Sequence, residues 1–251
     1  MPRRLIDTHA HLDDFEEMGG VIQRAREAGV DAIIAVGANM RACRLTLKWA
    51  EAYPGYVYPA LGVHPTEWFE EDVEETLRFV EEHLNRCVAV GEIGLDYWSR
   101  EARKNKAVRR RQREIYVRQL EMAVECDKPA SIHSRGSWRD ALDLALEHGP
   151  DRAVFHWYSG PLDVLKELLD AGFYISATPA IEHSRHHRAA LLEAPLERIL
   201  LETDSPVESR GRPSEPASLP LVARALAELK EVPVEEVVAS TTRSAELLFR
   251  L

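Results

Sequence analysis

The sequence contains few of the residues on which several protein classes depend. Among 251 residues only three are cysteine, and these residues, Cys43, Cys87 and Cys126, show no CxxC spacing. An odd number of widely separated cysteines argues against a disulfide framework and against a thiolate zinc site. No apolar run is long enough to cross a bilayer, and residues 1–4 lead into the first apolar segment without a signal-peptide core. We therefore expect a cytoplasmic protein that makes no contact with membranes.

Net positive charge is also lacking, because 42 acidic residues outnumber 32 basic residues and the formal net charge is −10. This balance argues against a protein that coats nucleic acid over its whole surface, which requires clustered Lys and Arg. The glycine-rich phosphate turns GxGxxG and GxxxxGK[ST] are absent as well. A doubly wound nucleotide-binding fold is therefore disfavoured, whereas a local basic strip is compatible with the composition.

Short β-rich segments alternate with longer amphipathic segments along the chain. The candidate strands are residues 5–8, 32–36, 57–61, 88–93, 130–132, 153–155, 173–176 and 199–201. Helical patterns lie between them at residues 20–28, 41–52, 73–84, 106–126, 138–147, 162–169 and 184–192. Repeated βα units of this length give parallel strands, and eight units match the size of a (β/α)8 TIM barrel. No linker divides the chain, so we predict one α/β barrel domain over residues 1–251.

Histidines and carboxylates fall at the ends of these predicted strands. They are His9, His11, Glu92, His133, His156 and Asp204. Taken singly, each of these residues is at least as often an ordinary core or turn residue as a metal ligand. In a parallel barrel, however, all strand ends of one kind face the same rim, so six such side chains converge in space. Their joint occurrence favours a metal site at that rim.

Imidazole and carboxylate ligands suit Zn²⁺, Mn²⁺, Ni²⁺ or Fe²⁺, and carboxylate-rich positions also accept Mg²⁺. Two ions roughly 3.5 to 4 Å apart lower the pKa of a bridging water to about 7 and stabilise the attacking and leaving oxygens. The predicted ligands are His9, His11 and Asp204 for one ion, and His133 and His156 for the other. Glu92 is the predicted bridge, and Asp204 is the candidate base for the attacking water.

Six motifs follow one another along the chain. They are DTHAHLD at residues 7–13, GVHP at 62–65, GEIGLDY at 91–97, IHSR at 132–135, HWYSG at 156–160 and LETDSP at 201–206. In this order and spacing, from Ile6 to Phe249, the chain resembles the TatD-related metal-dependent deoxyribonucleases of the amidohydrolase superfamily. The resemblance implies a barrel fold, divalent metal ions and cleavage of DNA phosphodiester bonds, often as a 3′ to 5′ exonuclease.

The chain departs from the family pattern at two places. Ser244 stands where the family usually has Asn in the motif TTxNAxxLF. Residues 211–216 read GRPSEP, with Ser214 in a stretch where Arg-Asn-x-Pro is expected. Both departures bear on substrate preference and loop structure, and neither changes a predicted metal ligand.

Further residues near the predicted ligands are candidate substrate contacts, namely His64, Asp96, Tyr97 and Arg135. Residues 100–118 are dense in Arg and Lys, and form either a phosphate track or a solvated helix face whose Arg stems cover apolar surface. His183, His186 and His187 follow the seventh strand and would line the rim, although loop histidines without function are commoner.

The predicted function is hydrolysis of DNA by a metal-activated water. The alternative is another amidohydrolase that cleaves a small amide, lactone or phosphoester, since the same ligands serve all three bonds. Such relatives often place a carboxylated Lys on the fourth strand, where this chain has Glu92. A silent barrel that only binds metal or a partner is disfavoured, because every expected ligand is present. The sequence indicates no protein partner.

Overall fold

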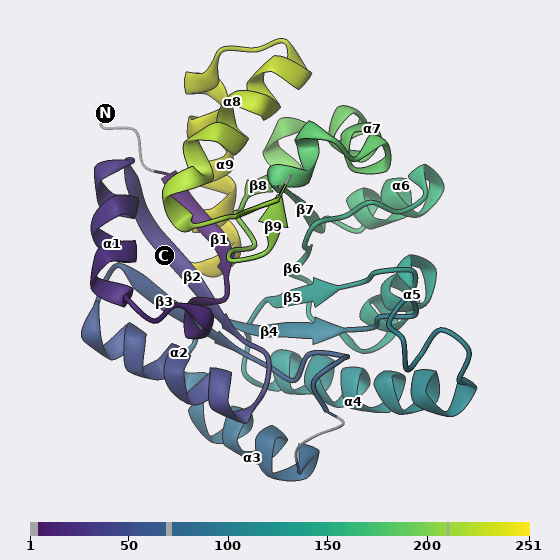
Figure 1. Ribbon diagram of the computed structural model, residues 1–251. Coiled ribbons are helices and arrows are strands. Elements are labelled where there is room, and N and C mark those ends of the chain that lie inside the picture. Colours follow the sequence, from purple (N-terminus) through teal and green to yellow (C-terminus); the bar gives the residue numbers. More distant parts are fainter. Residues whose placement is uncertain (1–4, 69–71, 210) are drawn as a thin grey trace.

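The computed structural model of the protein describes residues 5–68, 72–209 and 211–251. One sheet contains eight strands in chain order, and all neighbouring strands pair in parallel (Figure 1). The strands are β1 (Leu5–Ala10), β2 (Val30–Gly37), β3 (Val57–Leu61), β4 (Ala89–Gly94), β5 (Ala130–His133), β6 (Ala153–Phe155), β7 (Tyr174–Ala177) and β8 (Ile199–Leu201). All eight predicted strands are confirmed, with small shifts at their ends.

The sheet closes into a barrel between its first and last strands. Ala10 and Ser205 form a parallel bridge across this seam. The backbone amide of His11 donates to the Ser205 carbonyl at 2.8 Å, and the amide of Asp204 donates to the His9 carbonyl at 3.0 Å. The predicted (β/α)8 barrel is thus confirmed, and its closing seam carries three of the predicted metal ligands.

Helices alternate with the strands and cover the outside of the barrel (Figure 1). They are α1 (Met18–Glu27), α2 (Met40–Ala52), α3 (Val73–His83), α4 (Lys106–Glu125), α5 (Trp138–His148), α6 (Leu162–Asp170), α7 (Arg185–Glu193), α8 (Leu219–Lys230) and α9 (Val234–Phe249). The first seven were predicted from apolar periodicity. The last two, and a short hairpin of β9 (Glu208–Ser209) and β10 (Arg212–Pro213), were not. Helix α9 packs against β8 and β1, so it supports the closing seam.

The barrel interior is apolar below the rim that carries the predicted ligands. Val154 on β6 and Leu200 on β8 are fully buried members of one cluster, which also contains Leu248 and Phe249 of α9. Period-two alternation places Val154 on the same face as His156, two residues further along the chain. The layer of apolar side chains therefore supports the polar site from beneath and keeps water away from it.

Among the described residues, no helix combines the length and the apolar character that a membrane crossing requires. The cytoplasmic location expected from the sequence stays a prediction.

Candidate metal centre

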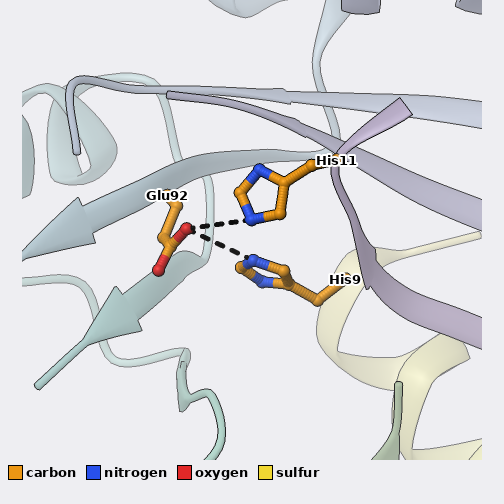
Figure 2. Close-up of side chains that lie close together, drawn as sticks. All are labelled: His9, His11 and Glu92. Atoms are coloured by element: carbon orange, nitrogen blue, oxygen red, sulfur yellow. Dashed lines mark ion pairs between the residues drawn. The ribbon is translucent and has the colours of Figure 1, made fainter. Parts of the chain in front are cut away.

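Glu92, inside β4, is the carboxylate around which the predicted ligands gather. Its Oε1 atom lies 2.7 Å from His156 Nε2 and 2.8 Å from His133 Nδ1. Its Oε2 atom lies 3.3 Å from His9 Nε2 and 3.5 Å from His11 Nε2, and Figure 2 shows both of these rings directed at the carboxylate. Each oxygen of Glu92 therefore faces its own group of imidazoles.

Asp204 completes the group on the Oε2 side. Its Oδ1 atom lies 3.6 Å from His9 Nε2 and 3.5 Å from His11 Nε2. The ligand atoms of His9, His11 and Glu92 all lie within 4.8 Å of one another, which is close enough for one ion to bind all three. Two imidazoles, Asp204 and the Oε2 atom of Glu92 thus converge on one candidate site for an ion.

On the Oε1 side, His133 Nδ1 lies 3.3 Å from His156 Nε2. His64 belongs to the same neighbourhood, because its Nε2 atom lies 3.4 Å from Glu92 Oε1. The set of His64, Glu92 and His133 also satisfies the spacing for a common ion. His64 was predicted only as a candidate substrate contact, but it lies as close to Glu92 as the predicted ligand His11 does.

The elements position these side chains at the carboxyl ends of the strands, as predicted, with one difference. His133 is the last residue of β5, and His156 directly follows β6. His11, which was expected on the first strand, lies beyond its last residue, Ala10, and precedes a short 3-10 helix. The pairing register of β1 also shifts between Asp7 and Ala10. Simple strand alternation therefore does not explain how His9 and His11 come to face one carboxylate.

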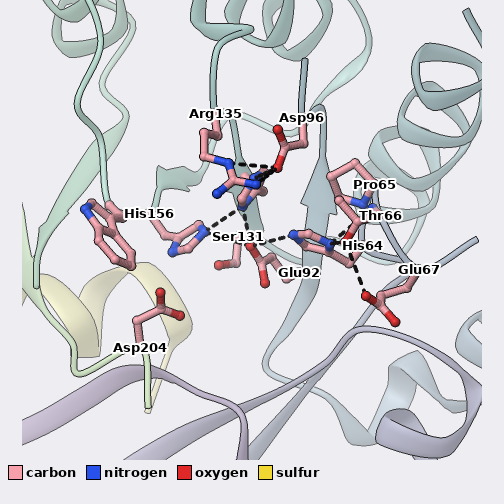
Figure 3. A network of polar contacts seen from close by, with 12 residues as sticks. His64, Pro65, Thr66, Glu67, Glu92, Asp96, Ser131, Arg135, His156 and Asp204 are labelled. Carbon is pink, nitrogen blue, oxygen red and sulfur yellow. Dashed lines mark hydrogen bonds and ion pairs between the residues drawn. The ribbon is translucent and has the colours of Figure 1, made fainter. Parts of the chain in front are cut away.

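A second layer of polar groups holds the free nitrogens of the imidazoles. The pairs are His9 Nδ1 with Ser131 Oγ at 3.4 Å, His156 Nδ1 with Glu202 Oε1 at 3.3 Å, His133 Nε2 with Asp96 Oδ2 at 3.1 Å and His64 Nδ1 with Thr66 Oγ1 at 2.7 Å. Figure 3 shows the contact between His64 and Thr66. Histidines that bind metals usually engage their second nitrogen in this way, which fixes the ring and its tautomer. Sequence reasoning missed Glu202, which lies just beyond the end of β8, where strand alternation no longer predicts the direction of a side chain.

Replacing Glu202 tests this second layer. Glu202→Gln keeps the shape of the side chain but removes the negative charge that makes His156 a stronger donor, so metal affinity is expected to fall roughly 10- to 100-fold. Titration of metal-free protein with Zn²⁺ measures the effect. Glu228→Gln, an exposed position on α8, is the matched control. Parental affinity in Glu202→Gln would show that this carboxylate does not support the centre.

The electrostatics of the centre favour a bound cation. Burial opposes ionisation of Glu92, but the surrounding His64, His156 and His9 outweigh it and hold the pKa of this carboxyl well below its usual range. Burial likewise opposes ionisation of Asp204, yet a hydrogen bond from His11 and nearby imidazoles lower its pKa to about 2. Conversely, Asp204 and Glu92 overcome burial and raise the pKa of His11 to about 9. The cavity therefore stabilises positive charge among its imidazoles.

One buried atom shows that these side chains fit a metal ion. His9 Nε2 is enclosed by protein and forms no hydrogen bond, although Glu92 and Asp204 both lie close to it. Leaving a buried polar atom unpaired costs about 1 to 3 kcal/mol, and coordination of an ion between the nitrogen and the carboxylates would remove that cost. The nitrogen and oxygen donors present are those that Zn²⁺, Mn²⁺, Ni²⁺ and Fe²⁺ prefer.

A cavity of about 810 Å³ opens above the centre. His64, Asp96 and Arg135, three of the four predicted substrate contacts, line it. The fourth, Tyr97, does not line it, because its side chain is buried and its hydroxyl donates to Asp140 at 2.7 Å. A substrate contact by Tyr97 therefore has no support in this geometry.

Four arginines of the basic segment at residues 100–118 are occupied by contacts within the protein. Arg111 and Arg118 both bind Glu74, and Arg113 binds Asp140 at 2.6 Å. Arg109 packs over the Tyr97 ring, 4.6 Å from its centroid. These contacts favour the helix-face interpretation over a phosphate track along α4.

The histidines after β7 lie outside the cavity lining. His183 and His186 are exposed, whereas His187 is buried and bonds the Tyr158 carbonyl through Nδ1 at 2.8 Å. Burial lowers the pKa of His187 to about 4, so this ring is a neutral structural group.

The two departures from the family pattern also have structural roles. Ser214 Oγ donates to the carbonyls of Thr203, at 3.2 Å, and Val207, at 2.9 Å, so it fastens the loop that carries Asp204. Ser244 Oγ donates to the Glu197 carbonyl at 2.9 Å and thereby attaches α9 to the segment before β8.

Comparisons with known proteins agree with this geometry. The family model described as TatD related DNase matches residues 6–250. Deoxyribonuclease TATDN3 of Homo sapiens is 32% identical over 260 residues, which cover 98% of this chain and 94% of that protein. The uncharacterized metal-dependent hydrolase YabD of Bacillus subtilis (strain 168) is 32% identical over 264 residues, covering 98% of this chain and 99% of that protein.

The fold comparison gives the same result. The crystal structure of YJJV, a TatD homolog from Escherichia coli k12, superposes with a TM-score of 0.90 at 30% sequence identity and covers 100% of both chains. The family resemblance expected from the six motifs is thus confirmed. Because the family model matches almost the whole chain, this protein belongs to the TatD-related DNase family and is a TatD-type hydrolase.

Proposed function

We propose that this protein is a deoxyribonuclease that hydrolyses DNA phosphodiester bonds at a centre of two divalent metal ions. The observation that carries the proposal is the arrangement around Glu92, whose two oxygens face separate groups of imidazoles. A carboxylate placed in this way is suited to bridge two ions. The printed name of the human relative, a deoxyribonuclease, supports DNA as the substrate.

The proposed ligands follow the two donor groups. His9, His11 and Asp204 would hold one ion, His133 and His156 would hold the other, and Glu92 would contribute to both. When bound, such a pair of ions supplies an activated water at neutral pH and stabilises negative charge on the phosphate. Zn²⁺, Mn²⁺, Ni²⁺ and Mg²⁺ are the candidate ions.

Asp204 is the proposed acceptor of the proton from the attacking water. Its side chain lines the cavity, so it is accessible from the substrate side, while its Oδ1 atom stays near His9 and His11. A general base must lie within hydrogen-bond reach of the water that it deprotonates. Glu92, the other carboxylate of the proposed ligand set, lies on β4 away from the seam and is surrounded by imidazoles.

Arg135 is the proposed phosphate contact. Its guanidinium is bound by Asp96, at 2.8 Å from Nη2 and 2.9 Å from Nε, yet its side chain is 55% exposed and lines the cavity. Asp96 therefore orients the group without covering it. A planar guanidinium held in this way binds a phosphate oxygen through its remaining N–H groups.

Substrate class and metal dependence are tested together. Protein stripped with a chelator and reconstituted with each candidate ion is assayed on single-stranded DNA, duplex DNA, RNA of the same sequence and bis(p-nitrophenyl) phosphate. We expect metal-dependent cleavage of DNA, with loss of single nucleotides from the 3′ end. Hydrolysis of small amides or lactones together with inert DNA would instead favour the amidohydrolase alternative.

A further inference from the structure

Trp98 exposes its indole ring on the rim that carries the metal centre. It follows β4 closely, and its side chain is 60% exposed. Within the described ranges it is the only exposed aromatic residue. A large aromatic side chain that stays exposed beside a reaction site can bury its free face against a ligand, which is consistent with a binding role.

The ring is held firmly by its surroundings. One face packs on Gly136, where a Cβ atom would lie 2.3 Å from Trp98 Cδ1. Its edge meets Trp138 in a T-shaped contact, with centroids 5.3 Å apart and planes at 87°. Trp138 in turn packs on Gly160 and lines the cavity. Three consecutive βα loops thus support one indole, which loses little conformational entropy when a ligand stacks on it.

Asp96 connects the aromatic platform, formed by Trp98 on Gly136 and Trp138, to the metal centre. Its Oδ1 atom accepts the backbone amides of Trp98 at 3.0 Å and Ser99 at 2.9 Å. Its Oδ2 atom faces His133 Nε2 at 3.1 Å and Arg135 Nη2 at 2.8 Å (Figure 3). One carboxylate therefore fixes the spacing among the aromatic ring, the phosphate contact and a proposed metal ligand.

Cationic side chains continue from the platform along the same loop. Arg100, Arg103 and Lys104 are exposed. Within the described part of the chain, none of them forms an ion pair with a carboxylate. Unlike Arg111, Arg113 and Arg118 of α4, they are available to a polyanion, which places phosphate-binding charge next to the indole.

We propose that Trp98, backed by Gly136 and Trp138, stacks a nucleobase of the DNA strand whose phosphate is bound at Arg135. This inference rests on the proposed function and specifies it further, because a base can stack there only when it is unpaired. Stacking on an indole accepts every base, since each has a π-face. The protein therefore selects single strands or frayed ends, without preference for sequence.

The test compares Trp98→Ala and Trp98→Phe with Leu247→Ala, an exposed apolar residue on α9 that does not line the cavity. The substrates are single-stranded oligonucleotides in which a tetrahydrofuran abasic unit replaces one nucleotide at successive positions from the cleaved bond. Trp98→Ala is expected to raise the KM for intact strands roughly 5- to 100-fold, while kcat changes little. Trp98→Phe restores most of the affinity. At one abasic position, parent and Trp98→Ala have the same KM.

The outcomes separate this inference from the proposed function. Unchanged KM in Trp98→Ala with active parent enzyme overturns the stacking role alone. An equal loss on every oligonucleotide and on bis(p-nitrophenyl) phosphate also overturns it, because a structural defect would then explain the effect. A parent protein that leaves all DNA intact, yet hydrolyses a small substrate, overturns the proposed function, and the stacking role with it.

Discussion

A Glu92→Gln variant is expected to fold like the parent and to lose hydrolytic activity by roughly a thousandfold or more, as when a group that stabilises transition-state charge is removed. The amide has the same shape, so packing inside β4 is preserved. It carries no charge, however, and one of its two terminal atoms is a donor that repels a cation. Since each oxygen of Glu92 faces a separate group of imidazoles, both donor groups are weakened by this single change.

Three measurements check this expectation, namely kcat on an oligonucleotide, bound metal by mass spectrometry and the melting temperature. Glu125→Gln, at the exposed end of α4, is the matched control and is expected to behave like the parent. Parental turnover in Glu92→Gln would contradict the bridging role. A large fall in melting temperature would attribute the loss of activity to the fold.

The double variant His9→Ala, His11→Ala is expected to lose all measurable hydrolysis and about one of the two proposed ions. Both imidazoles face Glu92 Oε2 and Asp204, so the donor group on that side is left with carboxylates alone. The group around His133 and His156 keeps its nitrogens. Metal stoichiometry therefore distinguishes two separate donor groups from one shared site, in which all bound metal would be lost together.

The matched control for this variant is His183→Ala, His186→Ala, which removes two exposed histidines, one before α7 and one in its first turn. It is expected to retain parental metal content and turnover. Full metal content and full activity in the His9, His11 double variant would refute the assignment of these residues as ligands.

The elements that could be predicted from the sequence are those in which apolar residues recur at a regular spacing. Alternation of strands and helices gave the barrel, and the shared direction of parallel strands brought Glu92, His133 and His156 together from distant positions. The loops followed no such period. His11 lies past the end of β1, and two neighbouring residues after β4 have opposite surroundings, since Tyr97 is buried whereas Trp98 is exposed. Once a strand ends, alternation no longer tells which side chain faces the substrate.

Partners that lie far apart in sequence were also beyond prediction. Arg111 and Arg118 read as free cations in the sequence, but Glu74, 44 residues before Arg118, binds both. Glu202 is a similar case, because its contact with His156 spans 46 residues. Composition shows how many charges a segment carries, and only the fold shows which of them are neutralised.

The closing seam of the barrel makes the proposed centre depend on two segments that lie almost 200 residues apart in the sequence. The Thr203 amide donates to Asp7 Oδ1 across 196 residues, and the Asp204 amide donates to the His9 carbonyl beside it. While the chain is still attached to the ribosome, β1 has emerged long before the segment that supplies Asp204. Until β8 docks against β1, the proposed base is missing and His9 lacks one of its carboxylate neighbours. A chain in which β8 has not yet docked against β1 is therefore expected to lack hydrolytic activity.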